Sequence, residues 1–268
     1  MNAVSAIVKE HKNNLYMIGR LSIYELKTAY VGNRLGLVWM ILNPLIQVII
    51  YWLVFGLGIR GGAPIQGVSF FVWLICGLIP WFYIGTGITQ GSNAIRSRLA
   101  IVSKMNFPLS VIPTYVIITQ LYTHFILVIV LMTIVSISHG LFAVSIVGLI
   151  YFSFTATCFL LALSFITSTL STIVKDIQYL VQSINRMLFF ITPIMWTMSD
   201  HTPHFLRVLI EINPFYYIVE GYRKSLLWGD ISMIFSLKTL YLWVVTLGMF
   251  VLGSILHVRF RKYFVDYL

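Results

Sequence analysis

The sequence predicts an all-α integral membrane protein. We expect six transmembrane helices, an N-terminal amphipathic helix at the membrane interface, and an outer re-entrant helical hairpin before the last span. Of the 268 residues, 59% are hydrophobic and 10% are charged, whereas soluble domains have about 45–50% apolar and about 25% charged residues. Uncharged apolar runs of membrane-crossing length recur along the chain. These runs are too long, and too rich in Leu, Ile and Met, to be strands of a membrane β-barrel.

This composition excludes a cytosolic enzyme, a disordered protein and a secreted disulfide scaffold. No soluble domain of this length has an interior large enough to bury so much apolar surface. The two cysteines, Cys76 and Cys158, lie in apolar runs, where thiols are expected to pack rather than to pair. Lys and Arg outnumber Asp and Glu by 18 to 8, which gives a net charge of +10. In a membrane protein this excess is typical of cytoplasmic loops, so we expect no nucleic-acid partner.

The six expected spans follow from the uncharged runs, because about 20 helical residues cross the hydrocarbon core. Their approximate bounds are 35–59, 68–95, 108–138, 141–174, 178–198 and 240–258. With the N terminus inside, most Lys and Arg fall in the inner segments. Positively charged segments favour the cytoplasmic face, so we expect a multi-pass protein of the cytoplasmic membrane with both termini in the cytoplasm.

The stretch 5–34 is expected to form the interfacial helix, with an interruption at Asn13-Asn14. On a helical projection its Lys and Arg residues fall on one side, while most apolar residues point elsewhere. The basic stripe has two interpretations. It could attract anionic lipid headgroups, or it could contact a phosphate-bearing substrate through Arg20, Lys27 and Arg34, which lie nearest the membrane entry.

The inner loop 93–107 is short and basic, and it is expected to form about three helical turns that end before a proline. On such a helix Ile95, Leu99 and Val102 share one side. An exposed apolar side of this kind could dock in a groove of a cytosolic subunit. The alternative is a plain loop whose charges only set the topology.

The outer segment 199–237 contains two apolar runs, each too short to span a membrane. Asn213-Pro214 is expected to make the turn between them. Glu220 and Lys224 are spaced i,i+4, as an ion pair on a helix requires. Two half-helices dipping from outside would cap a translocation path, with Asn213, Pro214, Glu220 and Arg223 as the residues that define this hairpin. The alternative is an amphipathic hairpin lying flat on the outer leaflet.

Polar residues recur at helical spacing within the expected spans, and such stripes face protein or water rather than lipid. They could line a polar path or only hold helices together. The candidates for path lining are Asn43, Gln47, Tyr51, Gln178, Gln182, Asn185 and Arg186. Arg186 is a functional candidate because a charge within a span is costly. Alternatively, its side chain pairs with Asp176 or reaches toward the cytoplasm.

Several kinds of chemistry are missing from the sequence. There is no Gly-x-x-x-x-Gly-Lys-[Ser/Thr] loop for ATP and no catalytic motif of a hydrolase or metalloprotease. Asp200, His201 and His204 are interpreted as solvated polar residues, so no metal site and no catalytic residue is expected. Acidic residues are almost absent from the spans, which disfavours an ion-coupled carrier. Energy for any uphill transport would therefore come from another subunit.

With this organisation, the chain resembles the permease subunits of type 2, polymer-exporting ABC transporters. The resemblance covers essentially the whole chain, 1–268, as a single transmembrane domain. It is carried by Asn43-Pro44, by KMNFPLSVIPTY at 104–115 and by EINPFYYIVEGYR at 211–223. Within that family, GLGIR at 56–60 with Ala63-Pro64 and the C-terminal 263–268 are most similar to the permeases that translocate wall teichoic acid in Gram-positive bacteria.

The resemblance implies an assembly and a mechanism. Two copies of the permease would pair with two cytosolic ATPase subunits, which would bind the ATP and magnesium, so this chain would need no cofactor. The loop carrying Arg96, Arg98, Leu99 and Lys104 would match the coupling helix that docks on the ATPase. The cargo would be an anionic polymer on undecaprenyl diphosphate, with the basic stripe as partner of the pyrophosphate. One alternative is export of another lipid-linked polysaccharide, of the O-antigen or capsule type. A less favoured alternative is a membrane-embedded transferase.

Overall fold

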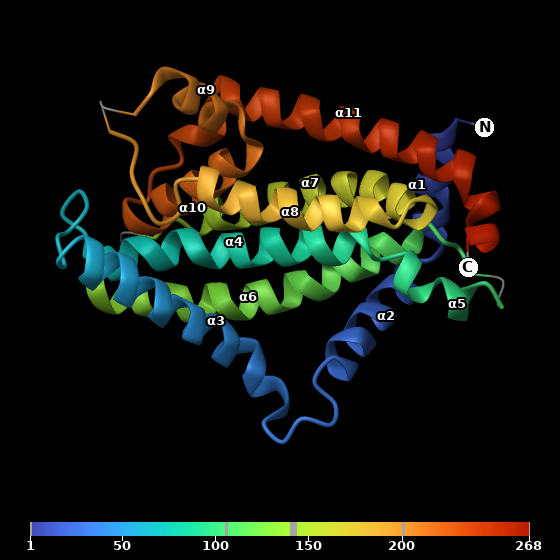
Figure 1. Cartoon of the computed structure of the whole chain (residues 1–268), viewed down its shortest axis with the longest axis horizontal. Coiled ribbons are helices and arrows are strands. Elements are labelled where there is room, and N and C mark those ends of the chain that lie inside the picture. The colour runs from blue at the N-terminus through green and yellow to red at the C-terminus, as the bar shows by residue number, and fades with distance from the viewer. Residues whose placement is uncertain (1, 105–106, 140–143, 200–201, 268) are drawn as a thin grey trace.

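The protein is described from a computed structural model that covers residues 2–104, 107–139, 144–199 and 202–267. Its described residues are mainly helical, with an isolated β-bridge between Ile65 and Val68. Long helices lie alongside one another in a bundle, and short helices cover both ends (Figure 1). The prediction of an all-helical membrane protein is therefore confirmed for the part of the chain that the structure describes.

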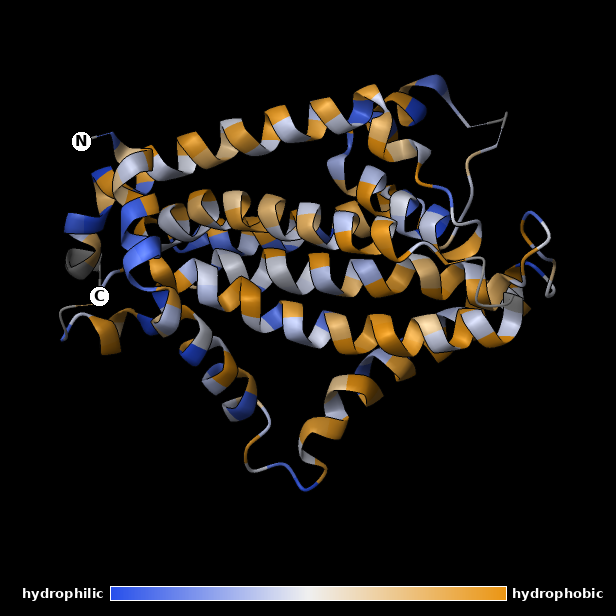
Figure 2. Cartoon of the chain, turned by 180° about the vertical axis from the view of Figure 1, so that it is seen from behind, coloured by the Kyte–Doolittle hydropathy of each residue, from blue (hydrophilic) through white to orange (hydrophobic). Residues whose placement is uncertain are grey.

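Five helical segments are long and apolar enough to cross a membrane. They are Gly36–Ile59, Phe70–Ser92, Val111–Ser138, Ile146–Ile173 and Leu237–Phe264. The first joins a 3-10 turn (η1, Gly36–Val38), α3 (Trp39–Tyr51) and a π-helix (η2, Trp52–Ile59). The others correspond to α4 (Phe70–Ser92), α6 (Val111–His139), α7 (Ile146–Ile173) and α11 (Leu237–Phe260). Figure 2 shows these helices mostly apolar, with hydrophilic residues gathered toward the ends of the bundle.

The expected fifth span, 178–198, corresponds to a shorter helix, α8 (Asp176–Ile191). Its 16 residues rise only about 24 Å, less than the hydrocarbon core of about 30 Å. The helix ends at Ile191 and is capped by Thr192, directly before Pro193, which cannot supply the next backbone N–H. In Figure 1, α8 runs alongside α4 in the bundle. The sixth crossing remains a prediction.

The centre of the bundle is α4, whose side chains are buried over nearly the whole helix. It packs against α6, α7, α8 and α10 (Pro214–Leu227). Small residues permit the close approach of α7, since a Cβ at Gly87 would meet Leu160 and one at Gly91 would meet Ser164. A second apolar cluster lies at the end of the bundle that holds the chain termini, around Ile18, Ile95 and Tyr115. The core is thus split between the membrane region and the N-terminal helices.

The interfacial stretch 5–34 forms two helices rather than one, so a single helix is wrong for this segment. α1 (Ala3–Asn13) and α2 (Leu15–Thr28) are separated at Asn14, where the sequence predicts a break. The Asn14 side chain donates to the Glu10 carbonyl at 2.7 Å and competes with the helical backbone bonds. After Thr28 the chain turns, and Gly32 adopts a positive φ of 92° that favours glycine.

The inner loop is also less regular than expected. It forms a 3-10 turn (η3, Arg96–Arg98) followed by the single turn of α5 (Leu99–Val102) instead of three helical turns. Ile95, Leu99 and Val102 are buried against the second apolar cluster of this same chain. Their side of the loop is therefore occupied, and Leu99, which is 2% exposed, does not present itself to a partner. Met105 and Asn106 of the loop lie outside the described residues.

The outer segment contains α9 (His204–Ile212) and α10, joined at Asn213-Pro214 as the sequence predicts. The Asn213 side chain accepts from the Phe215 N–H at 3.0 Å, and Pro214 occupies the first turn, where no donor is lost. Glu220 pairs with Arg223 at 3.5 Å and Lys224 with Asp230 at 3.6 Å. These partners replace the expected pair between Glu220 and Lys224. Asp200 and His201 lie outside the described residues.

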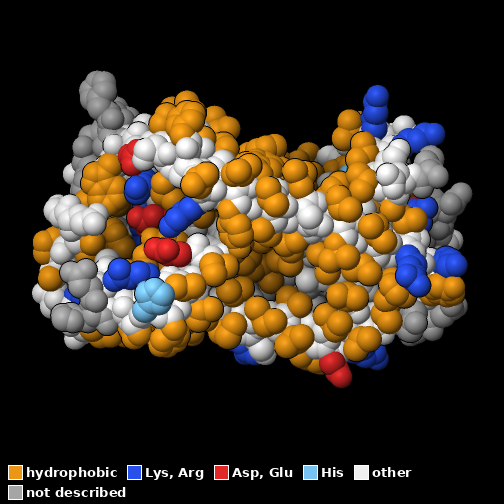
Figure 3. Space-filling model, turned by 90° about the horizontal axis from the view of Figure 1, so that it is seen from above, with side chains coloured by type: hydrophobic (Ala, Val, Ile, Leu, Met, Phe, Trp, Pro, Cys, Tyr) orange, Lys and Arg blue, Asp and Glu red, His pale blue; other side chains and the backbone are white. Residues whose placement is uncertain are grey.

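Both termini lie at the same end of the bundle, together with α1, α2 and α5 (Figure 1). The loop before α4 and the helices α9 and α10 lie at the opposite end. On the face seen in Figure 3, apolar side chains cover the middle and charged side chains gather toward the two ends. This distribution suits a molecule whose middle lies in hydrocarbon. Which end faces the cytoplasm remains the expectation from the Lys and Arg pattern.

Candidate functional site

A polar and aromatic groove runs along α4, between α3, α6 and α8. It consists of two adjacent cavities of about 510 and 280 Å³. Gln47, Phe82 and Thr86 line both cavities, so we treat them as one groove. The larger cavity lies between α3, α4 and α8, and the smaller lies between α3, α4 and α6. A polar path through the bundle would require polar side chains within the spans. The groove has such side chains.

Five of the seven residues predicted to line a path contribute to this groove. Asn43, Gln47 and Tyr51 recur every four residues on α3 and so lie on one face of the helix. Asn185 and Arg186 come from α8 on the other side of the larger cavity. The helical spacing in the sequence therefore indicates which face of each helix is polar, and the packing of the helices brings the two stripes to one groove.

The other two predicted residues are placed differently. Gln178 is used for packing, because its Oε1 accepts from the Ser92 hydroxyl at 2.8 Å and its Nε2 donates to the Thr89 carbonyl at 3.4 Å. Gln182 does not line either cavity. Asn185 has both functions, since its Nδ2 also donates to the Gly85 carbonyl at 3.1 Å. The α4–α8 contact is thus held by amide side chains that border the groove.

Aromatic residues that the sequence did not single out form much of the groove. Trp81, Phe189 and Phe190 line the larger cavity. The Phe189 ring lies 5.6 Å from the rings of both Tyr51 and Trp81, measured between centroids. Aromatic spacing alone could not identify them, because aromatic residues make up 15% of this chain. Their position only becomes specific once α3, α4 and α8 are packed together.

A buried polar network adjoins the smaller cavity. The sequence did not predict it. His124 of α6 stacks on Tyr83 with ring centroids 4.7 Å apart. Its Nε2 lies 2.6 Å from the Tyr222 hydroxyl, which also contacts the Ser153 hydroxyl. Four helices, α4, α6, α7 and α10, meet in this network. The spacing of Gln120 and His124, i,i+4 on α6, is the signal in the sequence that could have indicated it.

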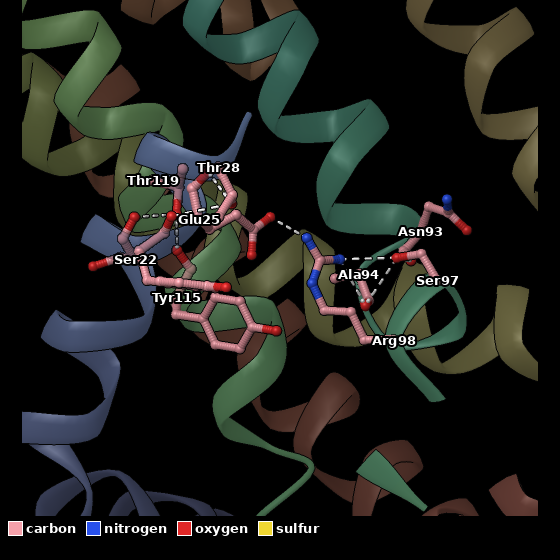
Figure 4. Close-up of polar contacts among 10 residues, drawn as sticks. Ser22, Glu25, Thr28, Asn93, Ala94, Ser97, Arg98, Tyr115 and Thr119 are labelled. Carbon is pink, nitrogen blue, oxygen red and sulfur yellow. Dashed lines mark hydrogen bonds and ion pairs between the residues drawn. The ribbon is translucent and has the colours of Figure 1, made fainter. Parts of the chain in front are cut away.

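The terminal end of the bundle holds a separate cavity of about 590 Å³ between α2 and the inner loop. Glu25 of α2 and Arg98 of η3 form an ion pair across it. Figure 4 shows the Arg98 guanidinium held between Glu25, Ala94 and Ser97. It donates to the Ala94 carbonyl at 3.0 Å and to the Ser97 hydroxyl at 2.8 Å. The two segments predicted to lie at the cytoplasmic face are therefore linked directly, which the sequence analysis did not anticipate.

Several other cations of this end have no ion-pair partner among the described residues. Lys104 is exposed and Arg96 is half-buried, and Ile101 beside them is 69% exposed. Arg20 and Lys27 are exposed on α2, seven residues apart and so on one face. Arg34 is exposed in the turn before the first span. This end therefore offers free positive charge along α2 and at the inner loop.

Arg223 anchors the end of the bundle opposite the chain termini. Its side chain is 1% exposed, and it donates to the carbonyls of Pro193 and Ile194 at 2.6 Å each. The guanidinium lies over the Trp73 ring, 3.6 Å from its centroid. A Cβ at Gly77 would overlap the guanidinium, so this glycine permits the close approach. Arg223 thus holds α10 against α4 and against the chain that leaves α8.

Together these features define an integral membrane protein whose packed helices border a polar, aromatic groove. The described residues contain no cluster of His, Cys, Asp and Glu that could hold a metal ion. A family described as ABC-2 type transporter matches residues 18–227, from α2 through α10. The chain belongs to this family of membrane permeases.

Three relatives share most of their length with this chain. The O-antigen export system permease protein RfbA of Myxococcus xanthus is 31% identical over 208 residues, which cover 74% of this chain and 75% of the relative. A protein of the same name from Klebsiella pneumoniae is 28% identical and covers 78% of this chain and 79% of the relative. A second protein of that name from Klebsiella pneumoniae is 26% identical and also covers 78% of this chain and 79% of the relative. All three are O-antigen exporters by name, and none is named for teichoic acid.

Proposed function

We propose that this chain is the permease subunit of an ATP-driven exporter that moves a lipid-linked polysaccharide-type polymer outward across the cytoplasmic membrane. The observation that supports this most directly is the groove along α4. Its amide, hydroxyl and aromatic side chains suit a hydroxyl-rich polymer, because sugars hydrogen-bond to amides and stack on aromatic rings. A channel for small ions would need neither the aromatic surface nor this volume.

The energy would come from a separate ATPase, since this sequence has no phosphate-binding loop of its own. Two ATPase subunits would bind ATP and magnesium, and two copies of this chain would form the transmembrane part. Arg96, Ile101 and Lys104 are the accessible residues of the inner loop, so we propose that they contact the ATPase. Arg98 and Leu99 would support that surface from within the chain.

The first candidate cargo is a polysaccharide of the O-antigen type. This proposal is supported by the names of the three relatives, which describe O-antigen export, and the first of them is 31% identical. The second candidate is wall teichoic acid. It is supported by the similarity of GLGIR at 56–60, Ala63-Pro64 and residues 263–268 to teichoic acid permeases. Both polymers would be carried on undecaprenyl diphosphate.

The test is purification from the native host in mild detergent through a tag on this chain, followed by an ATPase assay of what co-purifies. We expect a stoichiometric ATPase subunit whose activity is lost when Arg96 and Lys104 are both changed to Glu, because the reversed charges would repel the docking surface. A chain that purifies alone, with no nucleotide-dependent partner, would remove the energy source and contradict the proposal.

The basic residues of α2 and the following turn are proposed contacts for the diphosphate of the lipid carrier. Arg20, Lys27 and Arg34 are exposed, as such a contact requires. Changing all three to Gln should lower export of the lipid-linked polymer while the protein still inserts in the membrane, because charge-assisted bonds to phosphate are lost. Unchanged export would leave the stripe with the role of attracting anionic headgroups.

A further inference from the structure

The groove contains one kind of side chain that a neutral polymer does not require. Of the residues that line the larger cavity, Arg186 alone carries a charge. It lies on α8 ten residues after Asp176, about 15 Å along the helix. Its side chain is exposed and is bounded by the aromatic residues Phe189 and Phe190. The groups that line the cavity beside this guanidinium are aromatic rings and the amides of Gln47 and Asn185, on a helix that packs against the span α4.

No carboxylate neutralises Arg186 within the part of the chain that the structure describes. Its recorded contact is a weak hydrogen bond from Nη2 to the Ser183 hydroxyl at 3.4 Å. Glu10, Glu25, Glu220 and Asp230 form ion pairs with other cations. Asp176 is too far along α8 to pair with it, so this alternative from the sequence analysis is excluded. A charged residue at membrane depth is costly and normally has a partner.

We propose that Arg186 binds a phosphate ester of the cargo as the cargo occupies the groove. This inference rests on the proposed function and adds the chemical class of group that the site selects. The guanidinium presents a planar fork of donors that matches the oxygens of a phosphate. Asn185, Gln47 and the aromatic rings beside it would contact the uncharged part of the same polymer. The phosphate is either a phosphodiester in the polymer repeat or the diphosphate of the lipid carrier.

The experiment uses the complete exporter, permease with its ATPase, reconstituted in vesicles. Two probes on the same diphosphate lipid are compared: a polymer of polyol phosphate repeats and a neutral polysaccharide. The variant Arg186→Gln should raise the KM for cargo roughly tenfold, as expected for the loss of a charge-assisted bond. If the phosphodiester is bound, the ratio of anionic to neutral transport falls by that factor. If the carrier diphosphate is bound, the KM rises for both probes alike.

Two further variants separate binding from damage to the fold. Arg186→Lys keeps the charge without the fork, so it should recover a large part of the lost affinity, and added salt should weaken the recovered binding. Lys238→Gln removes an exposed positive charge on α11, outside the groove, and should leave both KM values unchanged. An unchanged KM in Arg186→Gln, or an equal loss in Arg186→Lys and Arg186→Gln, would overturn the inference. If the unmodified exporter transports neither probe, the proposed function fails first.

Discussion

Single buried side chains carry much of the specificity of this fold, and Arg223 is the clearest case. Its guanidinium satisfies two backbone carbonyls that have no helical partner beyond the end of α8. Burial of a guanidinium is costly unless its donors are used. The fork supplies two bonds in a fixed geometry, and Trp73 covers its face. The C-terminal end of α8 is therefore held in place by one residue of α10.

The change Arg223→Lys should lower the stability of the protein by about 3 kcal/mol, because the compact ammonium lacks the planar fork whose two nitrogens each reach one of the carbonyls, and buried groups lose well-placed partners. The thermal unfolding midpoint of the purified protein in detergent measures this effect. Arg259→Lys, at an exposed position on α11, is the matched control and should leave the midpoint unchanged. Equal midpoints for the two variants would show that the Arg223 contacts contribute little.

Glu10 gives a prediction about pH at the same scale. Burial raises the pKa of this carboxyl, but hydrogen bonds from Ser110 and Arg261, at 2.6 and 2.5 Å, hold the pKa below its ordinary value of 4.5. The stabilisation is therefore complete above the unfolded-state pKa and is lost as the pH falls through the lower folded-state pKa. Glu10→Gln removes the titrating carboxyl, so on acidification the unfolding temperature of this variant should fall less than that of the unmodified protein. Thermal scans at a series of acidic pH values measure this. The same fall in unfolding temperature for both proteins would show that Glu10 is not the group responsible.

Among the elements, α2 and the inner loop are linked by a contact between two residues that lie 73 positions apart in the sequence. The Glu25–Arg98 pair, the Arg98 bonds to Ala94 and Ser97, and the shared apolar cluster join the interfacial helix to the segment proposed to meet the ATPase. A displacement of the loop would therefore move α2. The same contact means that Arg98 is not free for a partner protein.

Reversal of this pair tests the link. Arg98→Glu places two carboxylates together, so ATP hydrolysis should continue with export reduced several-fold, because the loop no longer holds α2. The double variant Glu25→Arg with Arg98→Glu restores the pair and should recover export. Transport and ATP hydrolysis are measured on the same reconstituted preparation. Failure of the double variant to recover more than the single one would contradict a role for the pair.

For the whole molecule, the open side of the groove is the surface that most needs a partner. α3 and α8 both pack against α4 and border the groove. The exposed face of α8 combines apolar Met187 and Phe190 with polar Ser183 and Arg186. Lipid tails do not accept an unpaired guanidinium, whereas a second copy facing a shared polar path does. We therefore expect α8 of the two copies to face each other.

Cysteine cross-linking in membranes tests this arrangement. In a background with Cys76 and Cys158 changed to Ser, Met187→Cys should form a cross-linked dimer with a bifunctional thiol reagent, because its side chain is 53% exposed on the expected interface. Leu252→Cys, 51% exposed on α11, is the matched control and should stay monomeric. Cross-linking of Leu252→Cys instead would place the interface on the α11 side.

The sequence by itself determined the class of protein, five helices long and apolar enough to cross a membrane, and the turn at Asn213-Pro214. These features depend on local properties, namely apolar length, helical period and proline placement. It also indicated which faces of α3 and α8 are polar. Only the tertiary structure decided which faces meet: it brought Asn43, Gln47 and Arg186 to one groove, paired Arg98 with Glu25, and buried Leu99 and Arg223. Contacts of this kind join residues distant in sequence, so no local pattern specifies them.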